Sequence, residues 1–401
     1  MIPALIVFFC TYAVVALGRL PGLRLDRAGA ALVGASLMVG FGALSLEDAY
    51  RAIDLDTIVL LVGMMILVAN LKLAGFFGLA ARWVAERTRH PLSLLAGVIL
   101  ISGTLSAFLV NDTVCLMLTP LVAELALRLR RNAVPYLLSL AMASNIGSTA
   151  TITGNPQNIL IGSFSSIPYA QFAGALAPVA ALGLLVLFVL VALMFHREFL
   201  VRSRFEVPTE RARVHRALLI KAVIAAFGMI AAFFAGVPPA EVAIIAGALL
   251  LLTRRLKPER VYREIDWALI LLFAGLFVVV RGTEQALLTP EVLAWAERLT
   301  LDEPAMLALV SAALSNIVSN VPTVLVLKPF VAALPHPGRA WLVLAMASTL
   351  AGNLTIVGSI ANLIVVERAR RQRVEIDFWT YLKLGLPVTL ITIAIGVWWM
   401  R

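Results

Sequence analysis

The segment Ser106-Ala-Phe-Leu-Val-Asn-Asp-Thr-Val-Cys-Leu-Met-Leu-Thr-Pro120 is apolar at both ends and polar in its middle. Asn111, Asp112 and Thr113 stand where a continuous membrane helix carries no polar side chain. Non-helical backbone at membrane depth is tolerated only where it is buried in protein or lines a cavity. The segment therefore predicts a re-entrant hairpin, residues 92–127, whose tip lies inside the membrane.

The same pattern recurs late in the chain, in Ser315–Pro329, and predicts a second re-entrant hairpin at residues 304–334. Asn111 of the first tip is matched there by Asn320. Interrupted apolar segments at corresponding places in two halves of a chain are typical of transporters built from repeats.

The composition indicates an all-α integral membrane protein. Of the 401 residues, 61% are hydrophobic and 14% are charged, whereas soluble domains carry roughly 25% charged residues. The net charge of +10 comes mainly from arginines in short loops between apolar runs. The positive-inside rule explains this distribution, so we expect a lipid bilayer and no nucleic acid as the partner.

The apolar runs predict about ten transmembrane helices besides the two hairpins. Two of these spans, 135–162 and 340–365, contain glycine and polar residues, and the first also contains proline, so we predict two broken helices. The predicted spans are 2–18, 29–44, 57–74, 135–162, 176–195, 216–235, 240–253, 267–280, 340–365 and 380–400.

Loop charge predicts the orientation. The arginine-rich loops, among them the one with Arg24 and Arg27, fall on one side, which should be cytoplasmic, so both termini lie outside the cytoplasmic (inner) membrane. The first hairpin then enters from the cytoplasm and the second from outside. The halves are therefore inverted repeats, with repeat 1 at 1–196, a basic linker at 197–214 and repeat 2 at 215–401. Trp83 and Trp295 are matched positions of the two repeats.

Carboxylates within the membrane are costly unless they are paired or neutralised. Asp112 is the only carboxylate that we place at the centre of the transport region, and its repeat partner is the apolar Val321. Because the repeat does not require this carboxylate, Asp112 is the best candidate for carrying a proton. Asp54, Asp56 and Asp266 begin spans, where an acidic side chain favours the helix dipole, and they are interpreted as structural.

Basic side chains within the membrane are scarce. Lys328 lies deep in the second hairpin, where it could take part in proton coupling, bind an anion or extend to the interface. The sequence contains no well-placed intramembrane arginine that would hold a carboxylate substrate through two hydrogen bonds.

These motifs resemble the ion transporter superfamily, which includes arsenite efflux permeases, sodium/proton antiporters, citrate transporter-like proteins and sodium/dicarboxylate symporters. Gly154-Asn-Pro-Gln-Asn158, which follows Ser144-Asn-Ile-Gly147, is similar to bacterial anion permeases and plant silicon effluxers. Asn320-Val-Pro-Thr323 is similar to arsenite permeases. The resemblance implies inverted repeats, two hairpins, two broken helices and a homodimer that works by an elevator-like motion.

The resemblance also implies which residues bind substrate or ion. They lie at the two hairpin tips and in the two unwound segments: Asn111, Asp112, Thr113, Ser148, Thr149, Thr151, Asn155, Asn158, Ser319, Asn320, Thr323, Gly352, Asn353 and Thr355. In sodium/dicarboxylate symporters both tips read Ser-Asn-Thr, and the departure at Asn111-Asp112-Thr113 favours a proton or cation role.

The first functional hypothesis is a secondary transporter that exports a small oxyacid or oxyanion, arsenite- or silicate-like, in exchange for protons. The alternatives are sodium-coupled uptake of an organic or inorganic anion, with Na⁺ at the hairpin tips, and sodium/proton antiport. A channel or a membrane enzyme is a further alternative, but the chain lacks a nucleophile–base arrangement. No Walker A motif is present, so neither ATP nor another cofactor is expected.

Overall fold

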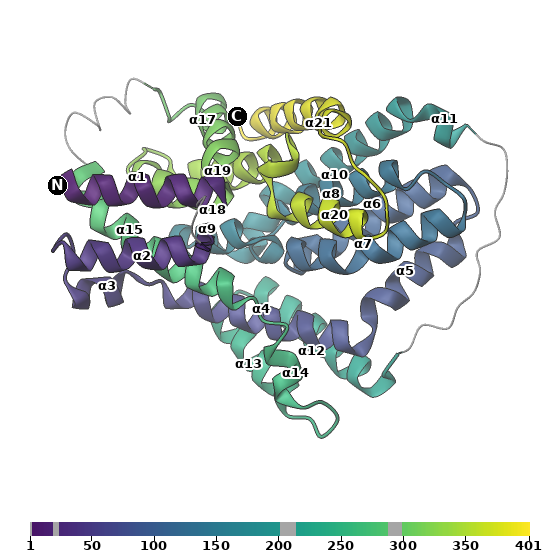
Figure 1. The fold of residues 1–401 in the computed structure, drawn as a ribbon, viewed down its shortest axis with the longest axis horizontal. Coiled ribbons are helices and arrows are strands. Elements are labelled where there is room, and N and C mark those ends of the chain that lie inside the picture. Colours follow the sequence, from purple (N-terminus) through teal and green to yellow (C-terminus); the bar gives the residue numbers. More distant parts are fainter. Residues whose placement is uncertain (1, 19–23, 201–213, 288–298) are drawn as a thin grey trace.

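The computed structural model describes residues 2–18, 24–200, 214–287 and 299–401, and its elements in these ranges are helices (Figure 1). Trp295 and most of the predicted linker lie outside the described residues. The first half contains α1 (Ile2–Leu17), α2 (Arg27–Gly40), α3 (Leu46–Ala52), α4 (Leu55–Ala74), α5 (Phe76–Arg87), α6 (Pro91–Phe108), α7 (Asn111–Arg128), α8 (Ala133–Ser148), η1 (Ile152–Gly154), α9 (Pro156–Ser165), α10 (Tyr169–Met194) and α11 (His196–Phe199).

The second half repeats this order of elements. It contains α12 (Arg216–Phe234), α13 (Pro239–Leu251), α14 (Pro258–Tyr262), α15 (Trp267–Leu287), α17 (Pro304–Val318), α18 (Asn320–Ala332), α19 (Pro337–Ala351), η2 (Ile356–Gly358), α20 (Ile360–Arg371) and α21 (Phe378–Trp399). In both halves a helical hairpin is followed by a helix, a short 3₁₀ turn and a second helix. The inversion of one half relative to the other stays a prediction.

The halves interlock through α4 and α15. Helix α4 packs on α13 of the second half, and α15 packs on α2 of the first half. A Cβ at Gly63 of α4 would lie 2.5 Å from the carbonyl oxygen of Ala243, and one at Gly275 of α15 would lie 2.7 Å from that of Ala31. Small residues allow membrane helices to approach this closely, so glycine makes both crossings possible.

Helix length and composition support a multi-pass membrane protein. Six helices in the described residues are long and apolar enough to cross a bilayer, namely α4, α6, α10, α12, most of α15 (Trp267–Glu284) and α21, and five more apolar helices are shorter. The shorter ones include α1, α2 and α13, which correspond to predicted spans.

The first hairpin has nearly the predicted bounds, whereas the broken helices are longer than predicted. Helices α6 and α7 have 18 residues each and extend from residue 91 to residue 128, against a predicted range of 92–127. A capping box between His90 and Ser93 begins α6, and an ion pair of 2.6 Å between Glu124 and Arg128 supports the end of α7. Helix α20 similarly continues to Arg371, because basic residues in its last turn favour the helix dipole. Polar helix ends therefore extend these elements beyond their apolar runs.

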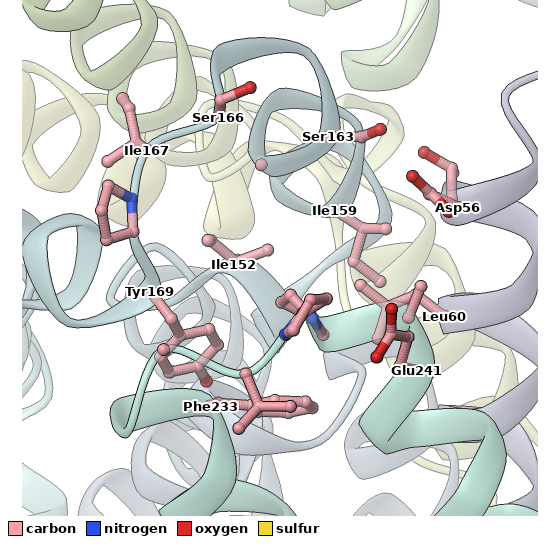
Figure 2. Close-up of a pocket in the computed structure, with 18 residues that line it drawn as sticks. Asp56, Leu60, Ile152, Ile159, Ser163, Ser166, Ile167, Tyr169, Phe233 and Glu241 are labelled. Carbon is pink, nitrogen blue, oxygen red and sulfur yellow. The ribbon is translucent and has the colours of Figure 1, made fainter.

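Helices α8 and α19 form the centre of the molecule and are buried along almost their whole length. Helix α9 packs on both α18 and α19, and α20 packs on α7 and α8, so each broken helix contacts elements of the other half. A cavity of about 580 Å³ separates the beginnings of α4 and α13 from η1 and α9 (Figure 2).

Candidate substrate and ion-binding site

Two asparagines bond to the unwound backbone of the broken helices. A helix that ends inside the protein leaves carbonyl groups without helical partners. Asn158 donates through Nδ2 to the carbonyl oxygens of Ser148 at 3.1 Å and Thr151 at 2.9 Å. Asn362 does the same for Gly352 at 2.7 Å and Thr355 at 3.0 Å. Both unwound segments are therefore held by an equivalent amide.

The two broken helices are also joined to each other by hydrogen bonds. The Ser359 hydroxyl, at the start of α20, donates to Oδ1 of Asn145 near the end of α8 at 3.1 Å. In the mirror position, Asn155 at the start of α9 donates through Nδ2 to Oγ1 of Thr349 near the end of α19 at 3.3 Å. These reciprocal bonds join the two halves at the centre.

Asn145 connects the first hairpin tip to both ends of the second broken helix's unwound segment, and the sequence analysis did not select it as a site residue. Its Nδ2 donates to Oδ1 of Asn353 and of Asn362, each at 3.0 Å. Its Oδ1 accepts from Nδ2 of Asn111 at 3.1 Å and from Ser359. The sequence did contain a signal for Asn145, because its polar amide stands in an otherwise apolar helix. Its matched position in the second repeat, Thr349, is also polar.

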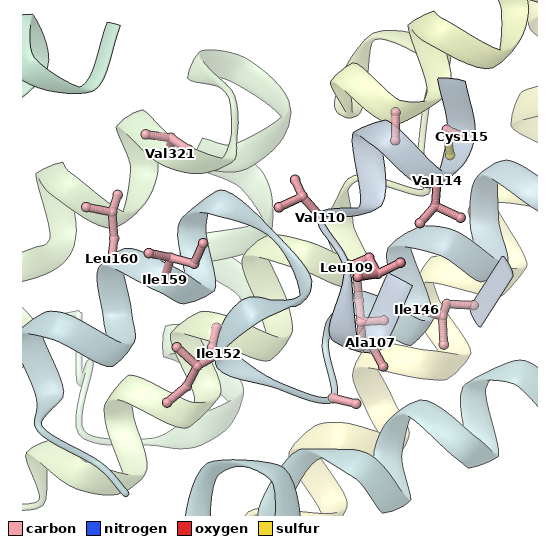
Figure 3. Close-up of a cluster of buried hydrophobic side chains, with 14 of the residues drawn as sticks. Ala107, Leu109, Val110, Val114, Cys115, Ile146, Ile152, Ile159, Leu160 and Val321 are labelled. Atoms are coloured by element: carbon pink, nitrogen blue, oxygen red, sulfur yellow. The ribbon is translucent and has the colours of Figure 1, made fainter. Parts of the chain in front are cut away.

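The first hairpin tip is fixed by these bonds and by apolar packing. Asn111 is buried, and its carbonyl oxygen accepts a bond of 3.2 Å from the Ser144 hydroxyl. Leu109 and Val110 lie in the turn and Val114 follows it, and all three are buried in the same apolar cluster (Figure 3). The tip is therefore held in one position by the end of α8.

The second tip is held less firmly. Ser319 has φ +80° and ψ 160°, a backbone conformation that is essentially restricted to glycine. Asn320 is buried, and its Oδ1 has no hydrogen-bond partner. The Thr323 hydroxyl donates within its own helix to the carbonyl of Ser319 at 2.9 Å. The second tip thus combines local strain with an unused acceptor.

Both tips meet at a small cavity of about 40 Å³. Polar side chains from several elements line it: Arg27, Asn111, Asp112, Gln157, Ser319, Asn320 and Ser359. The presence of Arg27 corrects the sequence analysis, which placed this residue in a cytoplasmic loop and found no arginine at the site. Arg27 begins α2, is half-buried and lies close enough for its charge to act on Asp112. The folding of α1 against α2 brings it there, and local sequence cannot reveal that.

Asp112 also lines a second cavity, of about 120 Å³. Other charged groups around this cavity are Lys72, Glu264 and Asp266, and Lys72 forms an ion pair with Glu264. Asp266 caps α15, as predicted, by accepting from the backbone N–H of Leu269 at 3.0 Å. Asp266 is nevertheless a second carboxylate beside Asp112, which the sequence analysis missed.

A cluster of unpaired oxygens lies beside Gly358 in the second half. Oδ1 of Asn316 and Oγ1 of Thr355 are buried without hydrogen-bond partners. A Cβ at Gly358 would meet Asn316 Oδ1 at 2.9 Å, the Gly352 carbonyl oxygen at 3.0 Å and Thr355 Oγ1 at 3.3 Å. Neutral carbonyl and hydroxyl oxygens are ligands for hard cations. The group therefore fits a small cation such as Na⁺, and Asn316 is a residue that the sequence analysis missed.

The remaining predicted residues have partners inside the protein. The hydroxyls of Ser148 and Thr149 donate to the Asn145 carbonyl at 2.8 and 3.2 Å, and Thr151 donates to the carbonyl of Ala107. Lys328 lines neither tip cavity, since its ammonium lies 4.1 Å from the ring centroid of Phe164. Thr113 lines the larger of these two cavities.

Paired hairpins, paired broken helices and a buried polar centre with charged cavities define a membrane transporter. A solved structure supports this fold: the YdaH transporter of Alcanivorax borkumensis matches with a TM-score of 0.58 and 17% identity over 99% of this chain and 95% of YdaH. The chain belongs to the citrate transporter family, CitMHS, whose model matches residues 12–351.

Several relatives of this chain are named as transporters. The silicon efflux transporter LSI3 of Oryza sativa subsp. japonica is 31% identical, covering 94% of this chain and 93% of LSI3. The transporter Rv2685 of Mycobacterium tuberculosis is 32% identical over 99% of this chain and 98% of its own length. The putative transporter arsB of Dictyostelium discoideum is 26% identical over 98% of this chain and 90% of arsB.

Proposed function

We propose that this protein exports a small neutral oxyacid, arsenite- or silicate-like, across the cytoplasmic membrane in exchange for protons. The similarity to a protein named as a silicon efflux transporter supports this substrate class. The membrane, the outside location of both termini and a homodimer belong to the same proposal. The two interlocked pairs α4–α13 and α2–α15 would form the fixed scaffold for an elevator-like motion of the hairpins and broken helices.

The observation that carries the proposal is the position of Asp112. It lines both the tip cavity, together with Arg27, and the larger cavity, together with Asp266 and Lys72. One carboxylate can therefore meet a substrate on one side and a proton on the other. No cation of the described residues lies within 4.0 Å of Asp112, so its charge is not neutralised by an ion pair there.

The chemistry of exchange follows from hydrogen bonding. An oxyacid with several hydroxyl groups can donate to the ionised Asp112, and Arg27 can donate to an oxyacid oxygen through charge-assisted bonds. Protonation of Asp112 removes the negative acceptor and weakens substrate binding. Proton and substrate thus compete for one carboxylate, which is the requirement for antiport.

The size of the tip cavity favours a small substrate. Its volume of about 40 Å³ is far below the roughly 300–1,000 Å³ that is typical of sites for larger small molecules. A molecule with a few oxygens around one central atom needs much less rearrangement to enter than a tricarboxylate does. The volume therefore supports an oxyacid rather than citrate in this conformation.

Transport by purified protein in vesicles with an imposed pH gradient tests the proposal. We expect Asp112→Asn to lose pH-driven arsenite or silicate flux, because the amide neither ionises nor takes up a proton. Glu124→Gln is the matched control, since Glu124 lies on the same helix but pairs with Arg128 at its surface end. Normal pH-driven flux in Asp112→Asn would disprove the proton role.

The unpaired oxygens of Asn316 and Thr355 favour one alternative, sodium-coupled uptake of an anion. These atoms and the Gly352 carbonyl would hold Na⁺, and Arg27 would face the anion. Flux that requires a sodium gradient and ignores pH would support this alternative. Thr355→Val should then raise the sodium concentration needed for half-maximal flux, whereas Thr355→Ser should not.

A further inference from the structure

The cavity of about 580 Å³ shares no lining residue with the two cavities beside Asp112. Its walls come from the beginning of α4, η1 and α9, the turn before α10, the end of α12 and the beginning of α13. None of the tip residues lines it. Small-molecule sites typically enclose about 300–1,000 Å³, so the volume is that of a ligand pocket.

The polar wall of this cavity is acidic. Asp56 and Glu241 both line it, and none of its lining residues is a lysine, arginine or histidine. The two carboxylates lie along one side of the cavity, opposite Ile167 and Tyr169. Such a wall repels an anion and attracts a cation, so the cavity does not suit the anionic substrates considered above.

An unpartnered hydroxyl lies beside the carboxylates. Thr57 lines the cavity, its side chain is fully buried, and its Oγ1 has no hydrogen-bond partner. Leaving a buried hydroxyl unpaired costs free energy, and a ligand N–H would remove that cost. The neighbouring Ser163 is already engaged, because its hydroxyl donates to Asp54 at 2.6 Å. Thr57 therefore provides an unpaired acceptor in the wall of the cavity.

The remaining walls are apolar and aromatic. Ile152, Ile159 and Leu60 line one part, and Phe233 lies at the base with Tyr169. The Tyr169 hydroxyl bonds with Thr153 at 2.8 Å, so Tyr169 offers its ring rather than its oxygen. The Tyr169 and Phe233 rings lie 5.1 Å apart and form a continuous surface for an apolar group.

We infer that this cavity binds a protonated organic amine with an apolar body. The ammonium group lies between Asp56 and Glu241 and donates one N–H to Thr57, while the apolar body packs on Phe233 and the isoleucines. Because the cavity lies between α4 and α13 on one side and η1 and α9 on the other, a bound amine links these elements. This consequence rests on the elevator-like motion of the proposed function, in which occupancy holds the first broken helix against α4 and α13.

Binding of 4-phenylbutylamine to the purified full chain, measured by calorimetry and thermal shift, tests the inference. The neutral 4-phenylbutanol is the matched probe without charge. We expect the amine to bind and the alcohol to bind at least roughly tenfold more weakly, since hydrogen bonds to charged groups are the stronger ones. Equal binding of amine and alcohol would overturn the inference.

Variants locate the site. The double variant Asp56→Asn with Glu241→Gln should weaken amine binding roughly tenfold or more, and Thr57→Val should weaken it severalfold. Glu47→Gln changes an exposed carboxylate of α3 outside the cavity and should bind like the original protein. Unligated melting temperatures show whether each variant folds. Unchanged amine affinity in a folded double variant would contradict the inference, whatever substrate the protein transports.

Discussion

The two unwound segments, after α8 and after α19, have the same backbone design but use their side chains differently. In the first segment Thr151 donates to the Ala107 carbonyl. In the second, the equivalent Thr355 has no partner and lies near the unpartnered Oδ1 of Asn316. Asn155 caps α9 through a bond of 2.8 Å to the N–H of Asn158. No side-chain cap hydrogen bond supports the start of α20.

The hairpin tips differ in the same direction. Asn111 of the first tip bonds to Asn145, whereas Oδ1 of Asn320 in the second tip stays unpaired next to the strained Ser319. Both halves leave buried side-chain oxygens unpaired, including Oδ1 of Asn111 and Oδ1 of Asn320. The first tip is nevertheless bonded to α8 through the amide nitrogen and the carbonyl oxygen of Asn111. The repeat supplies a common geometry, and individual side chains decide how each tip and each unwound segment is bonded to the rest of the protein.

The largest expected effect is at Asn145. Asn145→Ala removes four hydrogen bonds of a buried network, so we expect the free energy of unfolding to fall by about 3–4 kcal/mol. The mirror variant Thr349→Ala leaves the amides of Asn155 and Gln157 without one acceptor and should cost about 1–2 kcal/mol. Thermal unfolding in detergent measures both. Equal losses would contradict the larger contribution that the four bonds of Asn145 make to the network.

The next effect compares the two threonines. Thr151→Val leaves the buried Ala107 carbonyl without this donor, and we expect a loss of about 1–2 kcal/mol in unfolding free energy. Thr355→Val breaks no hydrogen bond donated by the hydroxyl, so its unfolding free energy should change by less than about 0.5 kcal/mol. Denaturant midpoints of the two variants measure the two losses in unfolding free energy. A larger loss in Thr355→Val than in Thr151→Val would contradict the difference in hydrogen bonding between the two threonines.

The smallest effect concerns the tips and has opposite signs in the two halves. Ser319→Gly relieves the positive φ and should raise the unfolding free energy by about 0.5–1 kcal/mol. Val110→Gly at the first tip, where φ is −53°, should lower it by at least about 1 kcal/mol because a buried side chain is lost. Differential scanning calorimetry of both variants measures these changes in stability. Destabilisation by Ser319→Gly would show that the backbone at the second tip is not strained.

Much of the architecture was predictable because its signals are local. Polar residues inside apolar runs marked both hairpins and both broken helices, and Asp112 stood out because a carboxylate is costly at membrane depth. Some helix ends were predicted less well, since basic residues such as Arg368, Arg370 and Arg371 extend α20 beyond its apolar run.

The sequence by itself determined a repeated all-α membrane protein with polar tips, because composition and spacing are properties of the chain alone. Only the tertiary structure decided which polar groups meet. Asn145 and Asn353 are 208 residues apart and share a hydrogen bond, and Arg27 reaches the cavity of Asp112 through the packing of α1, α2 and the hairpins. Whether a buried polar atom is paired or unpaired depends on such distant contacts, which the sequence does not display.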